Sequence, residues 1–248
     1  MRYFIELSYN GKNYHGWQIQ PNVISIQETL SNALSIILRT KIEIVGAGRT
    51  DAGVHALQMF AHFDLKFAID NEEIKLKLNA FLPEDIVVRA IFLVKDDAHA
   101  RFDATSRSYA YKIWLGRNPF ALETTWQLYQ QKLNIDKMNE AAAVLLEYTN
   151  FKCFSKSKTD VKTYNCNITE AKWVLDNNEL IFYISADRFL RNMVRAIVGT
   201  IVEIGLGKKN IEDLRAIIQS KDRCKAGFSV PAQGLFLTKV AYNDLLFD

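Results

Sequence analysis

Segments with strand and helix patterns follow one another in the same order twice along this 248-residue chain. Apolar residues alternate with period two in the expected strands and recur every three to four positions in the expected helices. In the first half the order is strand, helix, strand, strand, helix, strand, predicted over residues 2–9, 26–38, 41–45, 58–65, 71–81 and 86–94. In the second half the same order, with one added helix, is predicted over residues 108–115, 134–147, 167–175, 180–186, 189–205, 210–220 and 235–242.

This order predicts an α+β protein built from two ferredoxin-like (RRM-like) β-α-β-β-α-β units. No segment rich in Pro, Gly or Ser separates the two halves. We therefore expect the units to join into a largely antiparallel central sheet flanked by helices. The predicted domains are residues 1–100, which carry the candidate catalytic loop described below, and residues 101–248, which carry a basic surface.

Charge is distributed unevenly between these halves. Residues 1–100 hold 10 Lys/Arg and 12 Asp/Glu, whereas residues 101–248 hold 21 Lys/Arg and 16 Asp/Glu. A basic half is compatible with a polyanionic partner and equally with an ordinary solvated surface, and the charge alone does not decide between them. With 49% hydrophobic and 24% charged residues, the chain does not have the composition of a disordered protein.

Cysteine and targeting signals are sparse. An odd number of cysteines without a C-x-x-C pair argues against a disulfide framework and against a zinc site, and the three are Cys153, Cys166 and Cys224. The N-terminus has an acid at Glu6 and no long apolar stretch, so it does not resemble a signal peptide. Charged residues interrupt the longest apolar run, residues 193–204, so it is too polar to span a bilayer. We expect a cytoplasmic protein without a membrane segment or a metal.

The most distinctive local sequence is G-A-G-R-T-D-A-G-V-H-A, residues 46–56. Three glycines between two expected strands allow the backbone to approach a ligand closely. A guanidinium at Arg49 favours the ionised form of Asp51, and an ionised carboxylate is a candidate nucleophile. The loop lacks both the Walker and the dinucleotide fingerprints. From these residues alone, a purely structural hairpin with a surface ion pair remains an alternative.

Residues 46–56 resemble the signature of the tRNA pseudouridine synthase A family. Further segments resemble that family's motifs in the same order along the chain: residues 14–20 (YHGWQIQ), 99–102 (HARF), 107–111 (RSYAY), 189–195 (FLRNMVR) and 234–237 (GLFL). The chain departs from the family pattern at Asn150 and Cys153, where the family carries Asp and Ser, and at Ser108, where many relatives carry a basic residue.

The resemblance implies conversion of uridine to pseudouridine in the anticodon arm of tRNA, at tRNA positions 38 to 40. It places Asp51 on the catalytic aspartate, Tyr109 on the tyrosine that stacks on the flipped-out base, Arg195 on the arginine that pairs with the aspartate, and Leu235 on the apolar lining of the base pocket. Arg49 is assigned to substrate binding. The resemblance also implies a homodimer that binds the tRNA anticodon stem-loop. The isomerisation gains and loses no electrons, so we expect no cofactor.

The basic residues of the second half are candidates for RNA binding. Salt-sensitive contacts with the tRNA backbone are predicted for Arg101, Arg107, Lys156, Arg188 and Arg191. Arg195 is expected on an apolar helix that starts near residue 188, on one face with Arg188 and Asn192. An arginine there needs an anion, either Asp51 or a phosphate, unless it extends to the surface.

Two other functions remain open. A catalytically silent RNA-binding protein made of two RRM-like units has the same element order, although the RRM signature is absent from the sequence. A hydrolase with an Asp nucleophile would need a second acid or base near Asp51, and none is adjacent in the sequence.

Overall fold

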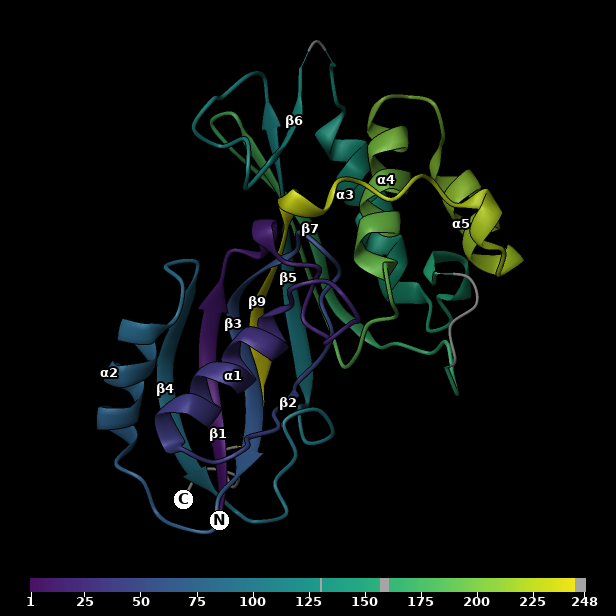
Figure 1. The fold of residues 1–248 in the computed structure, drawn as a ribbon. Helices are drawn as coiled ribbons and strands as arrows, with labels where there is room; N and C mark the ends of the chain where they lie inside the picture. Colours follow the sequence, from purple (N-terminus) through teal and green to yellow (C-terminus); the bar gives the residue numbers. More distant parts are fainter. Residues whose placement is uncertain (130, 157–160, 244–248) are drawn as a thin grey trace. The chain divides into compact units, whose positions relative to one another are not determined.

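The computed structural model describes residues 1–129, 131–156 and 161–243 and has an α+β architecture (Figure 1). Contacts group the chain into two compact units. Of the described residues, the first unit contains Met1–Thr105 together with residues 236–243, and the second contains those between Ser106 and Leu235. Each unit is described by itself below.

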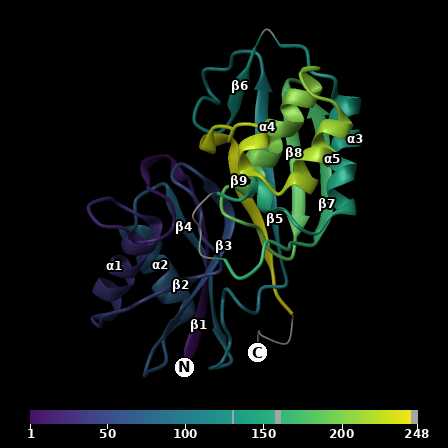
Figure 2. The ribbon, with the colours of Figure 1, turned by 90° about the vertical axis from the view of Figure 1, so that its right-hand side faces the viewer.

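The strands of the first unit lie in the order β4-β1-β3-β9, and β2 pairs with β3. Their bounds are β1 (Arg2–Tyr9), β2 (Val45–Gly46), β3 (His55–Asp64), β4 (Ile86–Val94) and β9 (Leu235–Ala241). β1 is antiparallel to β3 and β4, and β9 is parallel to β3. The helices α1 (Ile26–Leu38) and α2 (Asn71–Phe81) cover one face of this sheet (Figures 1 and 2).

Local sequence accounts for the helix starts in this unit. The Ser25 hydroxyl accepts a hydrogen bond from the Glu28 amide at the start of α1, and the Asp70 carboxylate caps α2. Leu30 and Leu34 are fully buried on the inner face of α1, one turn apart. The helix therefore begins where its cap stands and buries the predicted apolar stripe.

The strands of the second unit lie in the order β5-β8-β7, and β6 runs parallel to β5. Their bounds are β5 (Ser106–Leu115), β6 (Trp126–Leu128), β7 (Ile168–Asp176) and β8 (Glu179–Ala186). Both β5–β8 and β7–β8 are antiparallel. The helices α3 (Ile135–Val144), α4 (Met193–Gly205) and α5 (Ile211–Ser220) lie on one face of these strands (Figures 1 and 2).

Short 3-10 helices interrupt the connections of both units. They are η1 (Gly11–Asn13), η2 (Leu145–Glu147), η3 (Lys152–Phe154), η4 (Arg223–Lys225) and η5 (Ala232–Gly234). Asn210 caps α5, where its side chain forms a capping box with Asp213.

One predicted strand is largely absent. Residues 41–45 form strand structure only at Val45, although Ile42 and Ile44 are buried in the expected alternation. Their backbone groups bond to side chains of α1 instead of a strand: the Ile42 amide donates to Ser35 Oγ at 2.9 Å, and the Ile44 carbonyl accepts from Gln27 Nε2 at 2.8 Å. The alternation of apolar residues therefore predicts correctly which side chains are buried here, but not whether the backbone pairs with another strand. The short strand β6 was not predicted.

The α+β class and the mostly antiparallel strand pairing are confirmed. The ferredoxin-like units stay a prediction, as do the domain limits 1–100 and 101–248, because a compact group of contacts is not by itself an independently folding domain. Within the described part of the chain, no helix has the length and apolar character needed to cross a membrane.

Candidate functional site

Asp51 lies in the connection between β2 and β3, whose backbone is fixed near both ends. The Ala47 amide donates to the Phe60 carbonyl at 2.7 Å. Asp51 opens a tight turn in which its carbonyl accepts from the Val54 amide at 3.1 Å. Gly53 completes the turn with φ +77°, in the left-handed region that glycine adopts at no steric cost. Asp51 therefore lies at the first position of a well-defined turn, and its side chain is half-buried.

A second chain segment packs directly against this turn. Gly16 has φ +88°, and a Cβ at that position would lie 2.3 Å from the Thr50 carbonyl oxygen. The next amide, that of Trp17, donates to the same oxygen at 3.2 Å, and the Gly53 amide donates to the Tyr14 carbonyl at 3.3 Å. The G-W-Q segment and the Asp51 turn therefore form one backbone unit.

Gly11 makes a similar close approach on the other side of the turn. A Cβ there would lie 2.0 Å from the Val54 carbonyl oxygen, and the Gly11 amide donates to Nδ1 of the buried His55 at 3.0 Å. The His55 ring stacks on Phe236 with ring centres 4.6 Å apart. The histidine thus serves as a backbone acceptor.

The segment that holds the turn is itself fixed by groups that sequence reasoning missed. The Gln27 amide donates to the Trp17 carbonyl at 3.0 Å. The Tyr14 hydroxyl donates to Asp85 at 2.5 Å, and burial together with this bond raises the pKa of Tyr14 far above its usual value. These contacts join positions distant in sequence, and the resemblance of residues 14–20 to a family motif was the only signal for them.

Arg49 and Thr50 are adjacent but face opposite environments. Thr50 is buried, and its hydroxyl lies 2.9 Å from the hydroxyl of Tyr9. Arg49 is exposed, and its Nε donates to Gln18 Oε1 at 3.2 Å. The loop therefore anchors the Thr50 side chain in the core and leaves Arg49, the preceding residue and a predicted substrate-binding residue, at the surface.

In the second unit, Tyr109 lies on β5 with its ring half-buried. The ring meets Phe189 edge-on, with ring centres 5.0 Å apart and planes at 85°. Tyr111, two residues further along, is fully buried, and its hydroxyl donates to the Pro231 carbonyl at 2.8 Å. The RSYAY segment thus contributes one anchored and one partly accessible tyrosine.

Arg195 lies in the first turn of α4, and Leu235 begins β9. The Arg195 Nε donates to the Val230 carbonyl at 2.7 Å, and its side chain is half-buried. Leu235 is 7% exposed, and its amide donates to the Ala232 carbonyl. The segment 226–234 therefore contacts one of these residues and leads into the other.

The predicted start of this helix is wrong. α4 begins at Met193, so Arg188 and Asn192 do not share a helical face with Arg195. Asn192 has φ +67°, and a left-handed residue cannot continue a right-handed helix backwards. Its side-chain amide donates to Ser229 Oγ at 2.7 Å.

Four of the five residues predicted to bind RNA lie in or contact the segment 187–191, which precedes α4. Arg107 Nη1 donates to the Asp187 carbonyl at 3.0 Å, and the neighbouring Arg188 amide donates to the Asp187 carboxylate at 2.7 Å. The Lys156 amide donates to the Arg191 carbonyl at 3.0 Å. These residues come from three separate segments, so their proximity is a product of the fold.

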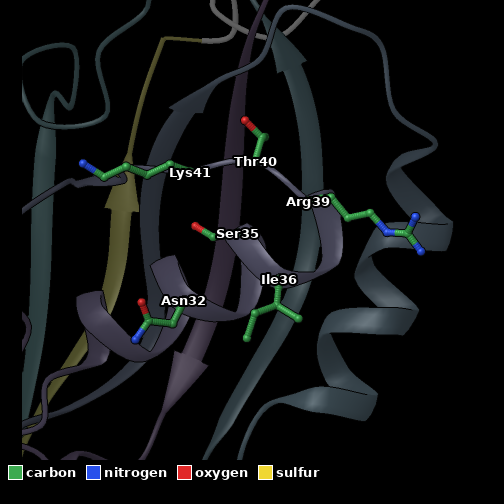
Figure 3. Close-up of a pocket in the computed structure, with 6 residues that line it drawn as sticks. All are labelled: Asn32, Ser35, Ile36, Arg39, Thr40 and Lys41. Atoms are coloured by element: carbon green, nitrogen blue, oxygen red, sulfur yellow. The ribbon is translucent and has the colours of Figure 1, made fainter.

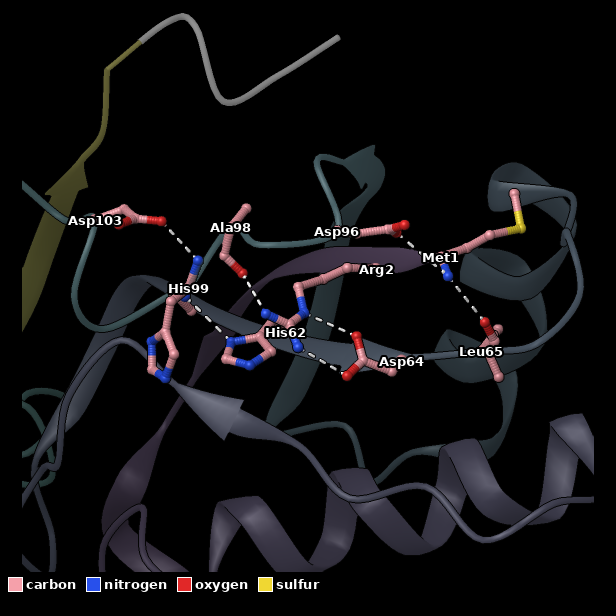
Figure 4. Close-up of polar contacts among 10 residues, drawn as sticks. Met1, Arg2, His62, Asp64, Leu65, Asp96, Ala98, His99 and Asp103 are labelled. Carbon is pink, nitrogen blue, oxygen red and sulfur yellow. Dashed lines mark hydrogen bonds and ion pairs between the residues drawn. The ribbon is translucent and has the colours of Figure 1, made fainter.

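The fifth, Arg101, lies in the first unit, two residues after His99. The His99 ring lies beside that of His62, with ring centres 4.6 Å apart (Figure 4). His99 Nδ1 accepts from the amides of Arg101 at 3.1 Å and Phe102 at 3.3 Å. The buried His62 Nδ1 accepts from the Ala100 amide at 3.1 Å. With His55, three histidines therefore accept backbone hydrogen bonds through Nδ1.

The buried thiols are unsuited to nucleophilic chemistry. Burial raises the pKa of both Cys153 and Cys166 to about 12, so they remain protonated at neutral pH. No cluster of three or more His, Cys, Asp or Glu side chains with metal-site geometry occurs among residues 1–129, 131–156 and 161–243.

A surface pocket lies elsewhere in the first unit, at the C-terminal end of α1 (Figure 3). Its lining consists of Asn32, Ser35, Ile36, Arg39, Thr40 and Lys41. None of these is a predicted site residue, and Lys41 forms an ion pair with Glu43 at 2.8 Å. The pocket therefore adds nothing to the Asp51 site.

Comparisons with known proteins agree with the motif order. A sequence model described as tRNA pseudouridine synthase matches residues 7–103 and 141–243. A tRNA pseudouridine synthase A of Parabacteroides distasonis is 53% identical over 99% of this chain and 98% of its own length. The proteins of the same name from Porphyromonas gingivalis (52% identical, 99% of each chain) and Clostridium acetobutylicum (41% identical, 96% of this chain and 98% of the relative) are also similar.

The sequence-model match, which covers most of both halves, defines the chain as one of the tRNA pseudouridine synthases. Within that class, identity over nearly the full length shows that it belongs to the tRNA pseudouridine synthase A family.

Proposed function

We propose that this protein is an isomerase that converts uridine to pseudouridine in the anticodon arm of tRNA, at tRNA positions 38 to 40, with Asp51 as the catalytic nucleophile. The observation that carries the proposal is the Asp51 turn, in which two separate segments fix the backbone around one half-buried carboxylate. Family membership over nearly the whole chain supports the reaction.

The reaction sets chemical requirements that these residue types meet. The N1–C1′ bond breaks, the uracil turns, C5 joins C1′, the C5 proton leaves to water and N1 gains a proton. A carboxylate is ionised at neutral pH and can attack or stabilise the reacting carbon without a cofactor. Held in a fixed turn, it needs little reorganisation when the substrate arrives.

Substrate-binding roles are proposed for Arg49, Tyr109, Arg195 and Leu235. A base inside a stem must be unstacked at a cost of a few kcal/mol, and stacking on an aromatic ring such as Tyr109 offsets about 1–3 kcal/mol. Arg195, as the partner of the carboxylate, and Leu235, as an apolar wall for the uracil, are supported by the family resemblance. Arg49 is at the surface, where it is accessible to RNA.

The proposed partner is the anticodon stem-loop of tRNA, bound by Arg101, Arg107, Lys156, Arg188 and Arg191. A homodimer follows from the resemblance and is proposed with it, as is the cytoplasmic location expected from the sequence. Light scattering tests the dimer: a mass of twice the 28.4 kDa chain supports it, and a stable monomer contradicts it.

Tritium release from tRNA labelled at uridine C5 tests the reaction. Wild-type protein should release tritium, whereas D51A and D51N should not. The matched control is E43Q, which removes an exposed carboxylate of the same unit and should keep full activity. Release from a tRNA with cytidine at positions 38, 39 and 40 would contradict the proposed site. Tight binding without release by the wild type would favour a silent RNA-binding protein.

A further inference from the structure

An extended segment runs beside α4 in the second unit and is called the strap here, residues 227–231. The Gly227 amide donates to Thr200 Oγ1 at 2.8 Å, and the Val230 amide donates to the Arg195 carbonyl at 3.3 Å. Between these points, a Cβ on Gly199 would lie 1.9 Å from the Phe228 carbonyl oxygen. The strap is therefore pressed against the helix with no room for a side chain at Gly199.

The strap sets the direction of the Arg195 side chain. Arg195 Nε donates to the Val230 carbonyl at 2.7 Å. The three nitrogens of a guanidinium lie in one plane, so fixing the Nε–H direction also fixes where the two Nη groups point. A shift of the Val230 carbonyl would turn the charged end of Arg195 with it.

The strap in turn is held by Arg223, which lies in η4 after α5. Arg223 Nη1 donates to the Gly227 carbonyl at 3.0 Å, and Nη2 donates to Ser229 Oγ at 3.0 Å. Asn192, the residue before α4, donates to the same Ser229 oxygen at 2.7 Å. The guanidinium of Arg223 thus holds the strap at two points, Gly227 and Ser229, just before the Val230 carbonyl that Arg195 contacts.

We propose that Arg223 is a positioning residue for the reaction, acting through the strap on Arg195 rather than by touching RNA. This inference rests on the proposed role of Arg195. Arg223 is half-buried, and both of its Nη groups are engaged by protein oxygens, unlike those of a residue that meets phosphates at the surface. Lysine cannot replace it, because a single ammonium does not reproduce two parallel, separated donors.

R223K tests the proposal because it keeps the charge and removes the fork. We expect kcat to fall about 10- to 100-fold, since small displacements of catalytic groups cost that much, while KM for tRNA changes less than about threefold. The control is R215K: Arg215 also anchors a helix of this unit, through Glu147, and its loss should lower thermal stability without changing kcat. If R223K does not fold, S229A removes the shared acceptor and gives the same readout.

A spectroscopic readout separates this inference from the proposed function. The Arg195 Nε–H signal, assigned by its loss in R195K, should exchange slowly with solvent in the wild type and in R215K but rapidly in R223K. In a double-mutant cycle, R223K should add no further loss of kcat to R195K.

An unchanged Nε–H exchange rate in R223K overturns the inference, and so does a loss of activity that appears only in KM. If R195K keeps full kcat, the proposed role of Arg195 fails and the catalytic part of the inference with it, whereas the exchange data still report whether Arg223 holds the strap.

Discussion

The hydroxyl of Tyr9 lies 2.9 Å from the hydroxyl of Thr50, the buried residue that directly precedes Asp51. Removing one partner of a buried hydrogen bond costs about 1–3 kcal/mol. We expect Y9F to lose stability in this range and also to lower kcat, because the backbone that carries Asp51 loses its anchor. Urea denaturation and tritium release measure the two effects.

Tyr3 provides a matched control for Y9F. Its hydroxyl accepts a hydrogen bond from the Ile69 amide at 3.3 Å, in the same unit but away from the Asp51 turn. Y3F should lose comparable stability and keep kcat. Equal activity of Y9F and Y3F would show that the Tyr9–Thr50 contact does not position the turn.

Substitution by alanine should destabilise the protein at one glycine of this region and have little effect at another. Gly16 has φ +88°, and its added Cβ would lie 2.3 Å from the Thr50 carbonyl, so G16A must strain the backbone or displace the turn. Gly48 has open space around it, so G48A should fold with a midpoint close to that of the wild type. We expect G16A to lose at least about 2 kcal/mol of unfolding free energy in urea titrations. Equal stability of the two variants would contradict the close packing of residues 16 and 50.

These contacts mark the limit of what the sequence predicts. The helices predicted to start at residues 26 and 210 begin within one residue of those positions, where Ser25 and Asn210 cap them through contacts that span four residues. The Tyr9–Thr50 bond joins residues 41 apart, and no periodicity or propensity reports it. Long-range hydrogen bonds of this kind hold the Asp51 turn, so its sequence marks the site without revealing what fixes it.

The error at Asn192 has a different origin. Residues 189–205 are predicted as one helix because apolar residues recur throughout, but the left-handed residue at position 192 delays the start of the helix to Met193. Asparagine tolerates that conformation, and the Ser229 hydroxyl that holds it is distant in sequence. The motif FLRNMVR is therefore assigned by resemblance, but its backbone conformation could not be predicted from the sequence.

Acid should destabilise the first unit through His62. Burial lowers the pKa of His62 to about 4 from an unperturbed 6.5. Arg2 and His99 add to the shift, and Asp64 and Asp103 oppose it. The unfolded chain therefore binds a proton below pH 6.5 that the folded chain accepts only near pH 4. The stability from neutral His62 is complete above pH 6.5 and is lost as the pH falls toward 4, about 3 kcal/mol in total.

Urea denaturation between pH 7 and 4 measures this loss, with H62N as the comparison. The asparagine carbonyl replaces Nδ1 as the acceptor for the Ala100 amide without binding a proton, so the loss of unfolding free energy over this range should be smaller in H62N by about 3 kcal/mol. The pKa of the half-buried His99 is also lowered by burial, and its contribution in the same range should remain. The same pH dependence in H62N and wild type would exclude His62 as the source.

The basic residues that gather before α4 should determine the salt dependence of tRNA binding. Each phosphate contact contributes about one unit to the slope of log affinity against log salt, because it releases a condensed counterion. R191A and K156A should each reduce the slope by about one and the double variant by about two.

K172A is the control: Lys172 is exposed on β7 but forms an ion pair with Glu170 at 2.7 Å. Fluorescence anisotropy with a labelled anticodon stem-loop measures the slopes. If K172A lowers the slope as much as R191A, binding reflects overall charge and not this cluster.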